Sequence, residues 1–111
     1  MQEHKVVLTW EAIYDVTDIA DYIEAEFGIA RADKFQRDIQ KQISDLAILG
    51  KAFKRTNIFY RSYYICKKPF PPSIIFYIIK EQEKEIHILR VLREECDWER
   101  MLTEQQEYRY R

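Results

Sequence analysis

The sequence predicts an α+β fold of the order β-α-α-β-β-β-α, in which a helical hairpin packs on one face of a small antiparallel sheet and a short C-terminal helix follows. Two long segments with apolar residues at helical spacing come first, and each ends at a glycine. Three shorter segments rich in β-branched and aromatic residues follow. The 111 residues, 47% hydrophobic and 33% charged, suit a single domain over 1–111.

The first predicted elements are a strand at residues 6–8 and a helix at residues 10–27. Thr9, between them, is a residue type whose side-chain oxygen accepts a hydrogen bond from the first turn of a helix. Gly28 ends this helix. Its apolar residues recur at steps of 3 and 4: Ile13, Val16, Ala20, Ile23 and Phe27. The acidic residues between them predict a solvated face: Asp15, Asp18 and Asp21.

A second amphipathic helix is predicted at residues 30–49, where Gly50 closes it. Its apolar residues keep the same period: Ala32, Phe35, Ile39, Ile43 and Leu46. Because the link between the two helices is short, they are expected to form an antiparallel hairpin. Each helix has one apolar stripe, so the hairpin must cover another layer, which is the predicted sheet.

The sheet is predicted from three segments in the second half of the chain. Residues 58–66 have the composition of a strand, whereas residues 67–72 are not expected to continue a paired strand because proline lacks an amide donor. Residues 73–80 are apolar on both parities, which is typical of a central strand covered on both faces. A polar turn at residues 81–85 leads to a last strand at residues 86–92.

The chain is predicted to end in a short helix and a frayed tail. Asp97 suits the cap of a helix that Trp98 anchors and that continues through Met101 and Leu102, and the polar tail at 104–111 is expected to fray. The hairpin covers only one face of the sheet. The other face therefore needs the last helix, a second copy of the chain or a partner protein as its cover.

Charge is unevenly distributed along this chain, whose net charge is only −1. Residues 51–80 carry 7 basic side chains, no acidic ones and 8 of the 16 aromatic residues. Such a segment favours a local patch for an anionic or large partner, and chance clustering in a Tyr- and Phe-rich sheet is the alternative. The partner-binding candidates are Lys54, Arg55, Arg61, Lys67, Lys68, Arg90, Arg93 and Trp98.

Cleavage of RNA would need a base, an acid and cations for the phosphate, and only the cations are plentiful here. The catalytic candidates are Arg61, Arg90 and Arg93. His87 shares strand parity with Leu89 and Val91, which predicts that it packs against the helices instead of acting as a base.

Arg90 has the opposite strand parity and is predicted to point to the face that the helices leave open. Both Arg90 and Arg93 are expected to face solvent. The alternative for Arg90 is a structural salt bridge to Glu85 or Glu95.

Several classes of site are not expected. The two cysteines, Cys66 and Cys96, suit neither a disulfide scaffold nor a zinc site, so no metal and no cofactor are predicted. No apolar run approaches the ~20 residues of a membrane helix. Residues 1–5 are followed by no apolar signal segment. These features predict a cytoplasmic protein without membrane contact.

Five segments, spread over residues 5–103, share their order and spacing with a known family. They read VVLTWEA at 6–12, DIADYI at 18–23 with FG at 27–28, ADKF at 32–35, IFY at 75–77, and ILRVL at 88–92 with Asp97 five residues beyond. With these segments, the chain resembles the RelE/ParE superfamily of bacterial type II toxins, the toxic half of toxin–antitoxin pairs. It is more similar to the ParE side than to the RelE side.

The resemblance implies a growth-inhibiting, plasmid-stabilising toxin that binds DNA gyrase and is neutralised by a cognate antitoxin. A disordered antitoxin segment would cover the open sheet face and pair its acidic residues with Arg61, Arg90 or Arg93. One alternative is a RelE-like, ribosome-dependent mRNA endonuclease. Another is a degenerate toxin that only binds antitoxin, because Arg93 stands where the family usually has His, and Glu95 and Cys96 stand where it has a basic pair.

Overall fold

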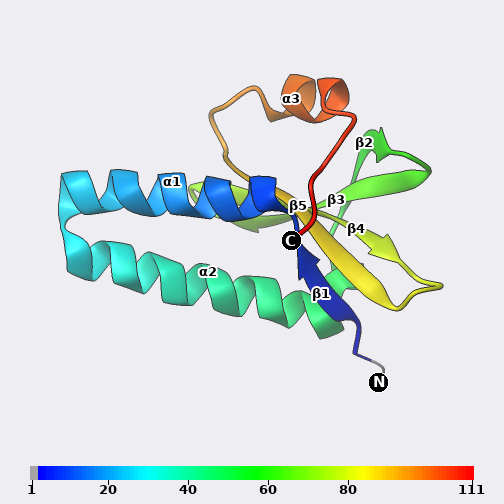
Figure 1. Ribbon diagram of the computed structural model, residues 1–111, viewed down its shortest axis with the longest axis horizontal. Helices are drawn as coiled ribbons and strands as arrows, with labels where there is room; N and C mark the ends of the chain where they lie inside the picture. Colours follow the sequence, from blue (N-terminus) through cyan, green and yellow to red (C-terminus); the bar gives the residue numbers. More distant parts are fainter. Residues whose placement is uncertain (1–2) are drawn as a thin grey trace.

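The computed structural model of the chain describes residues 3–111, so the start of the predicted domain at residues 1–2 lies outside the description (Figure 1). A 3₁₀ turn at Gly50–Ala52 follows the second helix. The helices and strands in chain order are β1 (Lys5–Leu8), α1 (Trp10–Phe27), α2 (Ile29–Leu49), β2 (Arg55–Tyr60), β3 (Tyr63–Phe70), β4 (Ser73–Lys80), β5 (Glu85–Arg93) and α3 (Trp98–Glu104).

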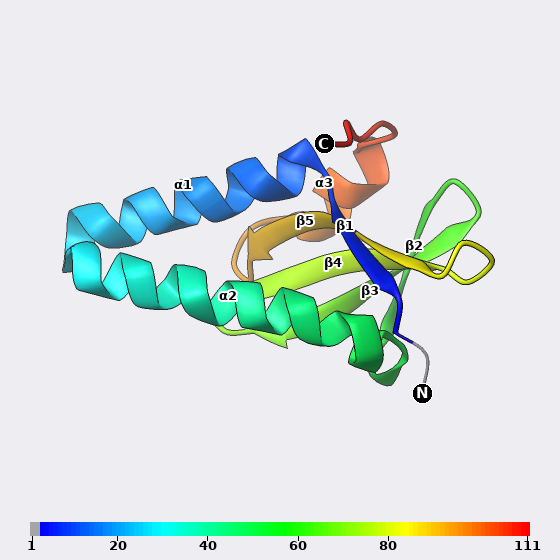
Figure 2. The same ribbon diagram turned by 60° about the horizontal axis from the view of Figure 1, so that its bottom comes forward.

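The five strands form one mixed sheet in the order β1-β5-β4-β3-β2. The antiparallel hairpin of α1 and α2 covers one face, and α3 with the C-terminal tail packs on the other (Figures 1 and 2). The predicted α+β class, the helical hairpin and the short C-terminal helix are confirmed. Of the three predicted ways to cover the second face, the chain's own last helix is the one observed.

The ends of α1 follow the predicted local signals. Thr9 Oγ1 accepts a hydrogen bond of 3.0 Å from the amide of Ala12 and donates one of 2.9 Å to the carbonyl of Leu89 on β5. This residue therefore caps the helix and also ties it to the sheet. Gly28 ends the helix at a φ of 96°, a conformation that few residues other than glycine adopt.

The central strand β4 is buried on both faces, as predicted. Ile75 and Tyr77 pack towards the hairpin, in a core that includes Ile39 and Leu46 of α2. Phe76 and Ile78 point to the opposite face, where the other core residues are Leu89, Leu102 and Tyr108. The sheet thus separates two apolar cores, one under the hairpin and one under α3 and the tail.

The predicted single strand over 58–66 is wrong. β2 ends at Tyr60 and β3 begins at Tyr63, and a two-residue turn separates them. Arg61, the first residue of this turn, has a φ of 57°, a left-handed conformation that Gly and Asn adopt far more often. Because neither residue type is present, the sequence carries no turn signal there. The sheet consequently has one more strand than predicted.

The prediction that residues 67–72 leave the sheet is also wrong, because β3 continues to Phe70 and pairs with β4 through Pro69. The amide of Lys67 points towards β2, where it donates to the carbonyl of Lys54 at 2.9 Å. The nitrogen of Pro69 points to the same side of β3 as the amide of Lys67. β2 begins only at Arg55, which pairs with Cys66, so no residue of β2 lies opposite Pro69. A missing amide donor costs nothing at such an edge.

The sheet was predicted to be antiparallel throughout. It is instead mixed, because β1 runs parallel to β5. Strands joined by short links pair antiparallel, and β2 to β5 obey this rule. β1 has no short link to its partner, since the helical hairpin and three strands lie between them in the chain. Its direction is therefore set by tertiary packing.

The C-terminal tail is docked and not frayed, which corrects the prediction for residues 104–111. Tyr108 is buried, and its ring meets the ring of Tyr60 edge-on at 4.8 Å. The carbonyl of Arg109 accepts a hydrogen bond of 2.8 Å from the amide of Trp10, and its own amide donates to Glu11 at 3.0 Å. The tail therefore closes the second core and returns to the start of α1.

Among the described residues, no helix combines the length and the apolar character that crossing a bilayer requires.

Candidate functional site

Four of the eight predicted partner-binding residues lie together at the β2–β3 edge of the sheet: Lys54, Arg55, Lys67 and Trp98. The ammonium of Lys67 lies 5.3 Å from the centre of the Trp98 ring, on the α3 side of the sheet. A hollow of about 310 Å³ is lined by Arg55, Lys67 and Trp98. The guanidinium of Arg55 also lies 5.1 Å from the ring of Tyr64 on β3. We call this group of four residues, together with Tyr64, the basic edge.

The cations of the basic edge have no acidic partner. Within residues 3–111, no carboxylate lies within ion-pair distance of Lys54, Arg55 or Lys67. Lys54 and Arg55 are exposed and Lys67 is half-buried. Unpaired positive charge gathered at one edge is suited to an anionic partner.

Arg61 lies apart from the basic edge, at the turn that ends β2. Its Nε donates a hydrogen bond of 3.1 Å to the phenol oxygen of Tyr60, and its guanidinium lies 5.2 Å from the same ring. The side chain is exposed and remains a candidate contact for a partner.

Lys68 is not at the surface, although the sequence placed it among the partner-binding candidates. It is 5% exposed, and its Nζ donates to the carbonyl of Gln42 on α2 at 3.2 Å. The ring of Phe53 lies 5.0 Å from the ammonium. Burial lowers the pKa of Lys68. Neighbouring residues of a strand point to opposite faces, which is why Lys67 and Lys68 have different surroundings.

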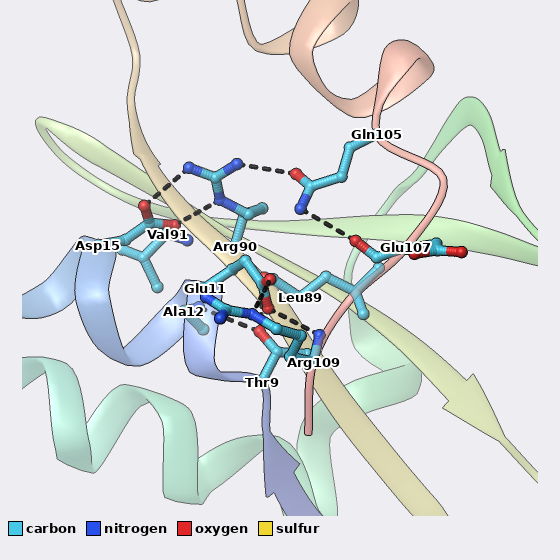
Figure 3. Close-up of polar contacts among 10 residues, drawn as sticks. All are labelled: Thr9, Glu11, Ala12, Asp15, Leu89, Arg90, Val91, Gln105, Glu107 and Arg109. Carbon is cyan, nitrogen blue, oxygen red and sulfur yellow. Dashed lines mark hydrogen bonds and ion pairs between the residues drawn. The ribbon is translucent and has the colours of Figure 1, made fainter. Parts of the chain in front are cut away.

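Arg90 is half-buried and does not face solvent, so this prediction is wrong. Its Nε and Nη2 donate to the two carboxylate oxygens of Asp15 at 2.7 and 2.8 Å, and its Nη1 donates to Gln105 Oε1 at 2.8 Å (Figure 3). The amide of Val91 donates to the same carboxylate at 3.0 Å. Burial raises the pKa of Asp15, and the hydrogen bonds from Arg90 and Val91 oppose that shift.

The sequence anticipated a salt bridge for Arg90 as an alternative, but named the wrong partners. The partner is Asp15, which was expected to be solvated, and not Glu85 or Glu95. Arg90 lies opposite Phe76, on the face away from the hairpin, as its parity predicted. A β-bulge in β5 places one extra residue between Arg90, which pairs with Phe76, and Ile88, which pairs with Tyr77. This bulge shifts the alternation of faces, so the parity argument that grouped His87 with Val91 fails.

His87 is buried, as predicted, but on the opposite face of the sheet from the hairpin. Its Nδ1 lies 2.9 Å from the phenol oxygen of Tyr110, and its Nε2 lies 2.9 Å from Glu85 Oε1. Ile86 and Ile88 face the hairpin in its place. Both ring nitrogens are therefore engaged by other side chains. Among residues 3–111, no group of three or more His, Cys, Asp or Glu side chains is placed to hold a metal ion.

Arg93 lies at a second surface, a groove between the far half of the helical hairpin and the start of β4. This hairpin groove has a volume of about 390 Å³, and its lining includes Tyr22, Phe27, Phe35, Pro72, Ser73 and Arg93. The guanidinium of Arg93 lies 5.0 Å from the ring of Tyr22. Its Nε is 2.7 Å from Glu95 Oε1, a contact that is ionic but lacks hydrogen-bond geometry.

The hairpin groove is apolar inside and basic at its rim. The hydroxyl of Ser73 is buried in it without a hydrogen-bond partner among the described residues, and Phe27 is 56% exposed. Arg31, 5.0 Å from the Phe27 ring, adds a second cation to the rim. The sequence analysis missed this surface. The available signal was Phe27, which lies on the apolar stripe of α1 but beyond the end of the sheet.

The fold, a helical hairpin and a short last helix on opposite faces of a five-stranded sheet, is the α+β class that the sequence predicted. A model of the family described as ParE toxin of type II toxin-antitoxin system, parDE, matches residues 6–98. The chain belongs to this family and is a ParE-like type II toxin. The resemblance to the ParE side of the superfamily is confirmed.

A solved structure described as the chromosomal ParDE TA system from P. aeruginosa has a similar chain. The TM-score is 0.66 at 23% sequence identity, and the match covers 82% of this chain and 96% of that chain. At this level of identity, the likeness supports the fold. No curated protein matches the sequence.

Proposed function

We propose that this toxin, as one domain over residues 1–111, inhibits DNA gyrase in the cytoplasm by binding and that a cognate antitoxin neutralises it. The observation that carries the binding mode is the state of His87, whose two ring nitrogens are engaged by Tyr110 and Glu85. A buried ring held in this way is not placed to take a proton from a substrate. A positioned acid or base supplies ~10²–10⁴-fold in rate, so cations alone support binding better than catalysis.

The antitoxin is proposed to place an amphipathic segment in the hairpin groove. The sheet face that the sequence left open to an antitoxin is covered by α3 and the tail, so the groove is the better surface. Its apolar floor suits the apolar face of a helix, and Arg31 and Arg93 at the rim suit acidic side chains. The similar P. aeruginosa structure is of a ParDE toxin–antitoxin system, which supports such a partner for this chain.

Two assays test the target. The first measures inhibition of gyrase supercoiling by the purified toxin, and the second maps mRNA ends by primer extension in cells arrested by the toxin. Gyrase inhibition that the antitoxin reverses, without new mRNA ends, is the expected result. Ribosome-dependent cuts inside codons, with gyrase unaffected, would contradict the proposal.

A RelE-like mRNA endonuclease is the second candidate function, and the basic edge favours it. Arg55 and Lys67 are unpaired cations that can hold phosphate groups, which a nuclease needs as well as a base. The primer-extension assay decides between the two targets.

A degenerate toxin that only binds antitoxin is the third candidate. The contact between Glu95 and Arg93 favours this candidate, because the carboxylate offsets a positive charge near the end of β5. A folded protein that binds the antitoxin tightly, but does not arrest the growth of cells that express it, would identify this case.

A further inference from the structure

The β2–β3 edge has a second hollow on the far side of Arg55. This hollow has a volume of about 470 Å³, and Arg55, Tyr63 and Tyr64 are among its lining residues. Arg55 also lines the hollow at Trp98, so this residue borders both hollows, and its guanidinium lies over the ring of Tyr64 in the larger one. An extended molecule that passes over the edge would meet this cation between two aromatic surfaces.

The aromatic side chains at this edge are exposed. Tyr64 is 41% exposed and Phe59 is 49% exposed, and their ring centres are 4.1 Å apart across the β2–β3 pair. By contrast, Tyr60 on the same strand is buried against Tyr108. An exposed pair of adjacent, tilted rings next to unpaired cations has the composition of a surface on which nucleic-acid bases stack.

The outer edge of β2 is poorly suited to the addition of a further strand, which argues against an extended peptide. The pairing of β2 with β3 shifts register between Arg55 and Phe59, and within this shift the hydroxyl of Thr56 donates to the carbonyl of Ile65 on β3 at 2.7 Å. Such a bulge interrupts the row of backbone groups that a peptide strand would use. Recognition at this edge must come from side chains.

We propose that the basic edge, with Phe59, binds single-stranded nucleic acid. Bases stack on Tyr64 at the larger hollow and on the adjacent Phe59 ring, Arg55 and Lys54 hold the phosphates at the edge, and Lys67 beside Trp98 holds the strand on the other side. All of these residues except Trp98 come from the segment 51–80, which contains no acidic side chain. The carboxylate of Glu81, which also lines the larger hollow, is paired with Lys51 at 2.6 Å. This inference does not depend on gyrase, since it concerns binding by the toxin itself.

The test is fluorescence anisotropy of the purified full-length protein with labelled oligo-dT and oligo-rU of about 15 nucleotides, a length within the range that one small domain covers. Binding of either probe supports the proposal, and the preferred probe identifies DNA or RNA as the source. Three neutralised phosphates predict a slope of about −2 for the logarithm of the association constant against the logarithm of salt concentration. The absence of binding to both probes at low salt would overturn the proposal.

Variants test the location of binding. Arg55→Ala is expected to weaken binding about tenfold and to reduce the salt slope by about 0.7. Tyr64→Ala is expected to weaken binding about tenfold, whereas Tyr64→Phe, which keeps the ring, retains it. Glu99→Gln is expected to tighten binding, because this carboxylate lines the hollow at Trp98.

Arg31→Ala is the matched control, because its guanidinium lies 5.0 Å from the Phe27 ring in the same kind of contact but at the tip of the helical hairpin. It is expected to leave binding unchanged. An equal loss of affinity in Arg31→Ala and Arg55→Ala would show nonspecific charge attraction and overturn the proposal. Equal binding of poly-glutamate, with no effect of Tyr64→Ala, would assign the edge to an acidic protein and overturn it as well.

Discussion

Arg90 on β5 and Asp15 on α1 form a two-point ion pair, with nitrogen–oxygen distances of 2.7 and 2.8 Å. Their side chains are 18% and 12% exposed. A third nitrogen of the guanidinium, Nη1, donates to Gln105, the residue that follows α3 (Figure 3). The Asp15 carboxylate also accepts a hydrogen bond from the amide of Val91, next to the bulge. One pair thus holds together the hairpin, the sheet and the C-terminal tail.

Removal of either charge is expected to destabilise the fold, because it leaves the other charge half-buried without a partner. We expect Asp15→Asn and Arg90→Ala each to lower the free energy of unfolding by about 3 kcal/mol. Arg90→Glu, which a solvent-facing Arg90 would have tolerated, is expected to be worse because it places two carboxylates together. Urea unfolding of the purified variants measures this.

The control is the exposed pair of Arg100 and Asp97, whose side chains are 69% and 66% exposed. Arg100→Ala is expected to change stability by less than about 0.5 kcal/mol. A similar small change in Arg90→Ala would show that the ion pair does not hold the elements together.

Tyr108 offers a test of the docked tail. Its ring fills the second core, but its hydroxyl is buried without a hydrogen-bond partner among the described residues. We expect Tyr108→Ala to cost about 3 kcal/mol and Tyr108→Phe to leave stability unchanged or higher, since it removes an unpaired polar atom. Thermal and urea unfolding compare the two variants. A tail that frays in solution would make both substitutions neutral.

Arg93 tests the hairpin groove. The side chain is 41% exposed, so Arg93→Glu is expected to keep the fold and its melting temperature. It reverses the charge at the rim of the groove, and we expect it to weaken antitoxin binding about tenfold or more. Isothermal titration calorimetry with the cognate antitoxin measures the change. Arg100→Glu, away from the groove, is the charge-matched control and should bind normally.

Glu81 predicts an acid-dependent loss of stability. Hydrogen bonds from Lys51, at 2.6 Å, and from His4 lower the pKa of Glu81 to about 2. Because the folded pKa lies below the ordinary value of 4.5, this contribution is present above about pH 4.5 and is lost as the pH falls towards 2. Denaturation curves at a series of pH values, for the wild type and Glu81→Gln, test it. Parallel pH profiles of the two proteins would refute the assignment.

The helices and the central strand were predictable from the sequence because their signals are local. The helical period, Thr9 as a cap, Gly28 as a stop and the continuous apolar run of β4 each depend on residues close together in the chain. The order of these elements, together with short family segments, was also enough to indicate a ParE-like toxin.

Part of the candidate site could be predicted as well. The basic composition of residues 51–80 indicated cations near aromatic rings, and Arg55, Lys67 and Trp98 do lie together. The sequence could not separate Lys67 from the buried Lys68, because the face on which each side chain lies depends on which side of the sheet the hairpin occupies.

Only the tertiary structure decided the roles of Arg90, His87 and the tail. A single extra residue in β5 shifts the alternation of the strand, so that His87 faces away from the hairpin. Arg90 finds its partner in Asp15, 75 positions earlier in the chain. Likewise, the polar tail is ordered because Tyr108 and Arg109 find partners on β2 and α1. The sequence alone determined the elements and the family, since those signals are short-range. Side-chain partners far apart in the chain depend on register and packing, which exist only in the folded molecule.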